Sequence, residues 1–297
     1  MAIAISPAAP HLSDQRQRLI GWLAVFGSAL CFYLATAIIN WGRPYVHIDA
    51  AFYTFARFVL GFGIVSATML IKGQRPSCTR VHYIIGRTVT NALAVFCFYK
   101  AVDVSTVASA NILNMTYPLF VALFSWFMIK GQRDVSALYV VGIASLGIWL
   151  ILAPGATTPQ LGNSWGLLSG FFAGFSILYL NLSRQYHDSQ TILFYMFGPG
   201  ALLILPFLSN SLFLPGKLDI AFLLACSAAG VLGQYLLTYG FLYVTAVEGA
   251  VISSSRILIA ALLGPLLVAD PPLTAAGWLG ALILIAANIF LAIRKTG

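Results

Sequence analysis

The sequence is poor in charge. Only 8% of its 297 residues are Asp, Glu, Lys or Arg, whereas a typical soluble domain has about 25%. Sixteen basic and eight acidic side chains cannot coat a globule of this size, which excludes one or two soluble domains. With 60% hydrophobic residues and a mean hydropathy of +0.91, the composition is that of a polytopic membrane protein. Its apolar runs last about 20 residues, which predicts membrane-crossing helices. Barrel strands would show alternating ten-residue segments instead.

Signatures of metal, nucleotide and hydrolytic chemistry are missing as well. The four cysteines have no CxxC or zinc-site spacing, and HExxH, GxSxG, GxGxxG and P-loop sequences are absent. The four histidines fall in loops or at span ends, with no acidic residue at metal-ligand spacing. We therefore expect no enzyme, no metal site and no cofactor. The net charge of +8 does not indicate nucleic-acid binding, because the basic residues sit singly between apolar runs.

The apolar runs predict an all-α protein of ten transmembrane helices. Their expected ranges are 18–40, 50–71, 81–100, 104–129, 135–153, 163–184, 190–209, 218–243, 246–268 and 273–294. Residues 1–17 are predicted to be a cytoplasmic tail without a cleavable signal, because Pro7 and Pro10 interrupt them. The connections are short, so adjacent helices must be antiparallel and no soluble domain is inserted.

The distribution of lysine and arginine predicts the orientation. With the N-terminus in the cytoplasm, ten of the 16 basic residues fall in inside segments, and only Arg43, Lys100 and Lys217 fall outside. This bias, with an even number of spans, places both termini in the cytoplasm of a bacterial-type inner membrane. The six tryptophans lie near predicted span ends, where an aromatic belt is expected.

A weak internal repeat divides the chain in two. Residues 98–126 and 238–266 align at a shift of 140. The matched pairs include Tyr99 with Tyr239, Ser105 with Thr245, Ala110 with Ala250 and Asn114 with Ser254. The two halves are repeat 1 at 18–153 and repeat 2 at 163–294, with five helices each. Because five is odd, the second half has inverted topology, the architecture that many transporters use for alternating access. A duplicated but static helical protein is the alternative.

Three features carry a resemblance to a known family. They are the arginine in Phe55-Ala56-Arg57-Phe58, the small residues from Ser105 to Pro118-Leu119-Phe120, and the glycines Gly142, Gly147 and Gly280. From Gly21 to Ile293 the chain resembles the drug/metabolite transporter superfamily, in its ten-helix exporter family with two EamA-type repeats. Within that family it is most similar to the aromatic and neutral amino-acid exporters. Many members carry a Gly-Glu pair between the last two helices of each repeat. Gly131-Gln132-Arg133 and Ala269-Asp270 stand there instead.

Polar side chains within the spans predict a substrate cavity, because an unpaired polar group is costly in hydrocarbon. The sixth candidate helix also has a small-residue face, Gly166, Gly170 and Gly174, which we expect to pack within one subunit. The candidate substrate-binding residues are Tyr33, Asn91, Tyr99, Asn111, Asn114, Ser176, Tyr179, Gln234, Tyr239, Ser254 and Arg256. Mixed aromatic and amide groups suit a zwitterion with an apolar side chain better than a phosphorylated sugar, which would need several cations.

Individual polar residues leave alternatives open. Pro118 has no N–H, so the carbonyl of Asn114 loses its helical partner and could receive a substrate ammonium beside Asn111. Both amides could equally form helix–helix hydrogen bonds. Arg256 lies near the centre of its span and either receives a substrate carboxylate or is a tether to carbonyls or to Glu248. Arg57 and Arg87 lie nearer span ends in the sequence.

We expect Arg57 and Arg87 to snorkel or to pair structurally. No carboxylate is placed in mid-membrane by the sequence, which favours facilitated export over proton antiport. The predicted function is export of small metabolites, chiefly neutral and aromatic amino acids, by a monomer embedded in the lipid bilayer. A drug, quaternary-ammonium or nucleotide-sugar carrier of the same superfamily is the main alternative, and a channel is a further one.

Overall fold

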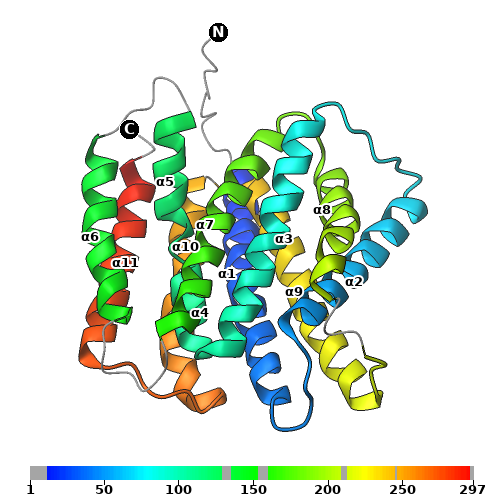
Figure 1. Ribbon diagram of the computed structural model, residues 1–297. Helices are drawn as coiled ribbons and strands as arrows, with labels where there is room; N and C mark the ends of the chain where they lie inside the picture. Colours follow the sequence, from blue (N-terminus) through cyan, green and yellow to red (C-terminus); the bar gives the residue numbers. More distant parts are fainter. Residues whose placement is uncertain (1–11, 129–134, 153–159, 209–212, 245, 295–297) are drawn as a thin grey trace.

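The computed structural model describes residues 12–128, 135–152, 160–208, 213–244 and 246–294. All regular structure in these ranges is helical (Figure 1). The helices are α1 (Leu12–Gly42), α2 (Ala50–Ile71), α3 (Val81–Val104), α4 (Val107–Asn114), α5 (Tyr117–Met128), α6 (Val135–Leu152), α7 (Gln160–Ser183), α8 (Ser189–Ile204), the 3₁₀ turn η1 (Leu205–Leu208), α9 (Lys217–Tyr243), α10 (Ala246–Leu267) and α11 (Ala275–Arg294).

The predicted all-α membrane fold is confirmed. Seven described segments are long and apolar enough to cross a membrane, and the shorter apolar helices are Tyr139–Ile151, Ile252–Leu267 and Ala275–Leu291. The first helix begins at Leu12, inside the segment predicted as a tail, while residues 1–11 lie outside the described part. α1 begins and α11 ends at the same end of the bundle, as an even number of spans requires (Figure 1). Which end faces the cytoplasm stays a prediction.

The fourth predicted span, 104–129, is wrong as a single helix. It is two helices, α4 and α5, separated at Met115 and Thr116. Pro118 lacks the N–H that would continue the helical ladder, and two side chains satisfy carbonyls near the break. Thr116 Oγ1 donates to the Leu113 carbonyl at 2.7 Å. Asn288 Nδ2 of α11 donates to the Met115 carbonyl at 3.1 Å. The break therefore brings irregular backbone to the middle of the bundle.

The helices pair as two inverted repeats. In the two repeats α1 corresponds to α7, and α3 corresponds to α9. The first helix of each repeat packs along the third helix of the other, so α1 packs along α9 and α7 packs along α3. α2 packs on α8 and α6 on α11, each against its own counterpart. This pseudo-two-fold pairing confirms the predicted two-repeat architecture. α6 and α11 form one flank of the bundle, which agrees with their nearly wholly apolar sequences (Figure 1).

Single contacts repeat at the corresponding positions. Asp49 accepts from the Ala51 N–H at 2.7 Å and caps α2, while Asp188 accepts from the Gln190 N–H at 3.2 Å and caps α8. The aligned pair Tyr99 and Tyr239 also behaves alike. Each hydroxyl accepts a hydrogen bond from the second helix of its own repeat, Tyr99 from Arg57 and Tyr239 from Gln190. The repeat therefore extends to side-chain contacts.

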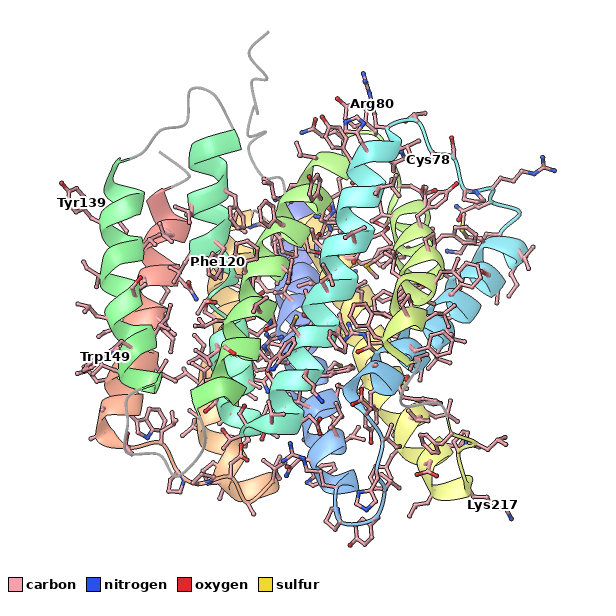
Figure 2. The ribbon with its side chains drawn as sticks, in the orientation of Figure 1. Cys78, Arg80, Phe120, Tyr139, Trp149 and Lys217 are labelled. Atoms are coloured by element: carbon pink, nitrogen blue, oxygen red, sulfur yellow. The ribbon has the colours of Figure 1, made fainter. Side chains whose placement is uncertain are left out.

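The outer surface suits a lipid environment. Many large apolar side chains are exposed, among them Trp149 and Tyr139 at 61% and 72% on α6. Figure 2 shows these two near opposite ends of α6, with the basic residues Arg80 and Lys217 at opposite ends of the molecule. Aromatic rings at both ends of an apolar belt are typical of a bilayer-spanning protein.

Asp270 joins the two repeats at one end of the bundle. It follows α10, and its Oδ2 accepts from the Ala108 N–H at 2.8 Å in the first turn of α4. The preceding residue, Ala269, has a φ of 53°, a left-handed conformation that glycine adopts more easily. In the family that the sequence resembles, many members carry glycine at the position of Ala269. Burial raises the pKa of Asp270 above its ordinary value, although the Ala108 hydrogen bond and the charge of Arg43 oppose the shift.

A raised pKa means that folded protein binds the Asp270 proton more tightly than unfolded protein. The stability from this group is therefore fully present below its ordinary pKa of 3.8 and is lost as pH rises through the folded value. We expect lowering the pH from about 7 toward 4 to raise the melting temperature of the wild type relative to Asp270→Asn. The asparagine oxygen can still accept from Ala108. Melting curves in detergent across this range test the prediction, and a pH-independent difference between the two proteins contradicts it.

Candidate functional site

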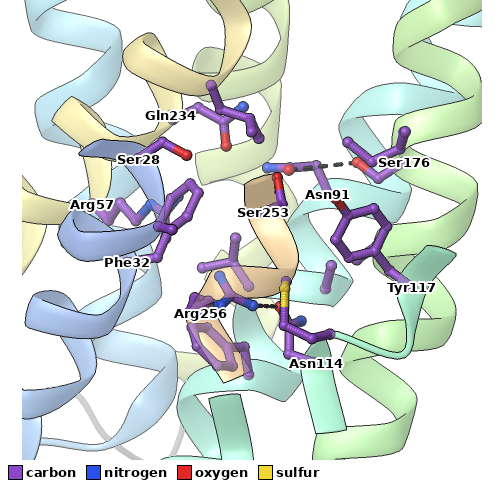
Figure 3. Close-up of a pocket in the computed structure, with 18 of the residues that line it drawn as sticks. Ser28, Phe32, Arg57, Asn91, Asn114, Tyr117, Ser176, Gln234, Ser253 and Arg256 are labelled. Atoms are coloured by element: carbon purple, nitrogen blue, oxygen red, sulfur yellow. Dashed lines mark hydrogen bonds between the residues drawn. The ribbon is translucent and has the colours of Figure 1, made fainter. Parts of the chain in front are cut away.

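A cavity with about 680 Å³ of empty space, its mouth included, lies at the centre of the bundle (Figure 3). It is lined from α1, α2, α3, α4, α5, α7, α9 and α10, and by Met115 at the break. Among the described residues, none of α6 or α11 lines it. The polar lining consists of Ser28, Arg57, Arg87, Asn91, Asn114, Tyr117, Ser176, Gln234, Ser253 and Arg256. The apolar lining consists of Ala29, Phe32, Ala94, Val95, Phe98, Met115, Ala173, Ile177 and Leu237.

Arg256 of α10 lies on this cavity and is only 4% exposed. Its Nη2 donates to Asn114 Oδ1, so the broken fourth span and α10 meet at this contact (Figure 3). Its guanidinium carbon lies 5.2 Å from the ring centroid of Phe98 and 5.7 Å from that of Phe32. Aromatic faces at these distances attract a cation. The Glu248 side chain, the other predicted tether, lies outside the described residues.

Arg57 and Arg87 do not snorkel; each pairs with a side chain inside the bundle, Tyr99 and Ser176 respectively, which was the other of the two expectations. Each is 2% exposed and lines the same cavity as Arg256. Arg57 Nη1 donates to Tyr99 OH at 3.1 Å, and its guanidinium carbon lies 5.2 Å from the Phe32 centroid. Each arginine lies about two turns inside its helix, α2 or α3, and faces the interior of the bundle rather than the near end of the span.

Arg87 of α3 reaches across to α7. Its Nη1 donates to Ser176 Oγ, and Ser176 Oγ lies 3.5 Å from Asn91 Oδ1, to which it donates (Figure 3). Asn91 Nδ2 is buried and has no hydrogen-bond partner. Three side chains from two helices therefore form a polar row along one wall, with a free amide donor at its end.

Five of the predicted binding residues line the cavity. They are Asn91, Asn114, Ser176, Gln234 and Arg256. The other six are not among its lining residues. They are Tyr33, Tyr99, Asn111, Tyr179, Tyr239 and Ser254. A role of any of the eleven in substrate binding stays a prediction. Tyr99 OH accepts a hydrogen bond from the lining residue Arg57, and Tyr239 OH accepts one from Gln190 at 2.8 Å. The ring of Tyr179 packs against Gly86 of α3.

The two asparagines of α4 have different roles. Asn111 is fully buried, and its Nδ2 donates to Thr36 Oγ1 of α1 at 2.9 Å and to the Val107 carbonyl at 2.8 Å. It forms a helix–helix hydrogen bond, as one of the two hypotheses holds. Asn114 donates to Ser169 Oγ of α7 at 2.9 Å and accepts from Arg256. It therefore fixes packing and at the same time orients a cationic group of the cavity.

Sequence reasoning missed several lining residues besides the two arginines. Phe32, Phe98 and Tyr117 supply aromatic faces, and Ser28 and Ser253 supply hydroxyls. The small Ser28 carried no distinct signal. Phe98 follows Asn91 and Arg87 by seven and eleven residues, a helical spacing that groups all three on one face of α3, although Phe98 was not among the predicted binding residues.

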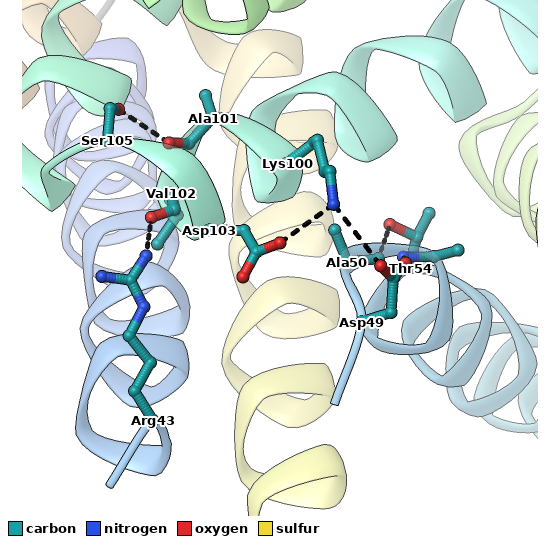
Figure 4. A network of polar contacts seen from close by, with 10 residues as sticks. Arg43, Asp49, Ala50, Thr54, Lys100, Ala101, Val102, Asp103 and Ser105 are labelled. Atoms are coloured by element: carbon teal, nitrogen blue, oxygen red, sulfur yellow. Dashed lines mark hydrogen bonds and ion pairs between the residues drawn. The ribbon is translucent and has the colours of Figure 1, made fainter. Parts of the chain in front are cut away.

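Corresponding contacts lie at the two ends of the bundle. After α1, Arg43 donates to the Val102 carbonyl at the end of α3, beside Lys100, which pairs with Asp49 at 3.5 Å and with Asp103 at 3.0 Å (Figure 4). After α7, Arg184 donates to the Thr238 carbonyl near the end of α9. Since α7 and α9 correspond to α1 and α3, one arginine-to-carbonyl contact lies at each end.

Comparison with known proteins agrees with this architecture. The model of the EamA-like transporter family matches the chain twice, at residues 19–153 and 160–293. A pseudopaline exporter CntI from Pseudomonas aeruginosa PAO1 is 32% identical over 245 residues, 80% of this chain and 85% of the relative. An uncharacterized transporter from Helicobacter pylori J99 is 30% identical over 215 residues, 70% and 72% of the two chains. One solved crystal structure covers 94% of this chain and 98% of its own with a TM-score of 0.59; at 17% identity it supports the fold alone.

Proposed function

The chain belongs to the EamA-like transporter family and is a multi-pass integral membrane transporter, and from this we propose that it exports small carboxylate-bearing metabolites, amino acids and their derivatives, across the inner membrane. The observation that carries the proposal is the position of Arg256, buried on the central cavity between amide, hydroxyl and aromatic groups. A guanidinium forks onto a carboxylate with two parallel hydrogen bonds. The aromatic rings suit the apolar part of such a molecule.

Alternating access is the proposed mechanism. The inverted repeats give two similar bundles that can exchange conformations. The Pseudomonas relative is an exporter of a small metabolite, pseudopaline, which supports export as the direction. None of the described residues that line the cavity is acidic, so we propose facilitated export without a proton-binding carboxylate.

Of the alternatives, a quaternary-ammonium carrier fits the cavity least, because three arginines repel a cation. A carrier of nucleotide sugars or other phosphorylated molecules gains support from the same arginines, since such substrates need several cations. A channel is separated from a carrier by kinetics, since only a carrier saturates and shows counterflow.

The test is counterflow in liposomes that contain the purified protein. Radiolabelled amino acids are exchanged against neutral, aromatic, acidic and basic amino acids and against choline. We expect saturable counterflow that at least one class of amino acid competes for and choline does not. Competition by choline without competition by any carboxylate-bearing compound contradicts the proposed substrate class, and a flux that never saturates contradicts a carrier.

A further inference from the structure

Among the described residues, the cavity carries three positive charges and no negative one. Arg57, Arg87 and Arg256 line it, each at most 4% exposed, and no aspartate or glutamate is among the described residues around it. Arginine stays protonated in proteins at neutral pH. Three like charges that share one cavity raise its electrostatic potential, and none of the described lining residues carries a negative charge to compensate for them.

The partners of these arginines are neutral. Arg57 donates to a tyrosine hydroxyl, Arg87 to a serine hydroxyl and Arg256 to an amide oxygen. The Nε of each of the three arginines is buried and has no hydrogen-bond partner. A buried charge is stable only when it is paired and its hydrogen bonds are satisfied. The unused donors and the uncompensated charge together point to an anion as the missing partner.

The three side chains come from three helices and approach the cavity from different walls. Arg57 of α2 and Arg256 of α10 both lie against the Phe32 ring, at 5.2 and 5.7 Å from its centroid. Arg87 of α3 is held by Ser176 of α7. One carboxylate is satisfied by one guanidinium fork. A net-neutral amino acid would leave the remaining arginines uncompensated and would bring its own ammonium into a positive potential.

We infer that the substrate is a small organic anion with at least two negatively charged oxygen groups, bound jointly by Arg57, Arg87 and Arg256. This inference rests on the proposed export function and narrows its substrate class. Carboxylates and phosphates share the chemistry that the three guanidinium groups recognise. Net negative charge also supplies the driving force, because an inside-negative membrane potential expels an anion without a coupling ion.

Binding to the purified protein in detergent tests the charge requirement. The probes are butyrate with one carboxylate, glutarate with two, citrate with three, glucose 6-phosphate with a phosphate, and the zwitterion phenylalanine. Calorimetric titration is expected to give at least about tenfold tighter binding for glutarate, citrate or glucose 6-phosphate than for butyrate and phenylalanine. The citrate and glucose 6-phosphate arms separate a carboxylate from a phosphate substrate.

The possible outcomes separate this inference from the proposed function. If phenylalanine binds as tightly as the multiply charged probes, the inference is overturned and amino-acid export stands. If none of the multiply charged probes binds, the inference is likewise overturned. If choline, added as a sixth probe, is the one compound that binds, both are overturned.

Variants connect the charge preference to the arginines. Arg57→Gln and Arg87→Gln are each expected to weaken binding of the multiply charged probe at least about tenfold while butyrate changes less. Arg184→Gln is the matched control, since Arg184 is a half-buried arginine bound to carbonyls outside the cavity. Melting temperatures identify any variant that fails to fold, and Arg→Lys at the same position then replaces it. The joint binding is overturned if Arg57→Gln and Arg87→Gln weaken the binding of all probes equally. It is also overturned if Arg184→Gln weakens binding of the multiply charged probe as much as they do.

Discussion

Arg256→Gln is expected to lower the transport efficiency of the carrier about 100-fold or more without lowering its melting temperature. A buried charge pair that loses one member costs about 2–5 kcal/mol of binding, and each 1.4 kcal/mol is tenfold. Glutamine removes the charge that the substrate carboxylate meets but can still approach Asn114. Stability should be unchanged or higher, because the variant no longer buries a cation whose partners are an amide oxygen and two rings.

Two measurements distinguish this role from that of a structural tether. Counterflow in liposomes gives the transport efficiency, and thermal melting in detergent gives the stability. A tether predicts the opposite pattern, a clear fall in melting temperature with unchanged substrate affinity in the protein that remains folded. Arg256→Lys retains the charge but loses the planar fork, so it should fall between the wild type and Arg256→Gln.

The helical architecture was largely predictable, because the lipid bilayer limits which chain segments can cross it. Hydrocarbon requires apolar runs of fixed length, and these gave the helices to within a few residues in most of the chain. The alignment of Tyr99 with Tyr239 gave the repeat, and the structure shows that both hydroxyls receive a hydrogen bond from the second helix of their repeat. Polar residues on the first, third, fourth, sixth, eighth and ninth predicted spans also identified helices that line the cavity.

The residues that line the cavity were less predictable, because a residue lines it only if its face of the helix points toward the cavity rather than toward a neighbouring helix. Tyr33 and Asn111 are as buried as the lining residues, but they point into contacts between helices. Arg57 and Arg87 are buried because their side chains face inward, toward Tyr99 and Ser176, and the sequence does not show which way a side chain faces. Nor could the repeat reveal them, since a shift of 140 places Phe197 and Ser227 at the corresponding positions.

This asymmetry has a physical meaning. The contacts that hold the two ends of the bundle, formed by Arg43 and Arg184, occur in both repeats. The charges that face the cavity do not, because two arginines come from repeat 1 and one from repeat 2. A symmetric scaffold gives two conformations of similar energy, whereas an asymmetric cavity can recognise an asymmetric molecule in one orientation. The scaffold and the binding site are therefore constrained by different requirements.

A close helix contact in the cavity wall lies between α7 and the broken fourth span. The glycine face of α7 packs within the chain, as expected, with Gly166 against Leu113, Gly170 against Thr116 and Gly174 against Phe120. At Gly170 an added Cβ would overlap Thr116 Oγ1 and would lie 2.9 Å from the Leu113 carbonyl oxygen, which is backbone. The neighbouring Ser169 accepts from Asn114, so this contact also positions the partner of Arg256.

Gly170→Val is therefore expected to lower both stability and transport. Overpacking of a close contact costs about 1–3 kcal/mol and more where backbone must move, so we expect a much reduced yield of folded protein and a lower melting temperature. Gly170→Ala should show the same effects in smaller degree. Gly63→Val is the matched control, because a Cβ at this glycine of α2 meets nothing within 4 Å. If Gly170→Val melted and transported like Gly63→Val, close packing of α7 on the fourth span could not be what holds Asn114 and Arg256 at the cavity.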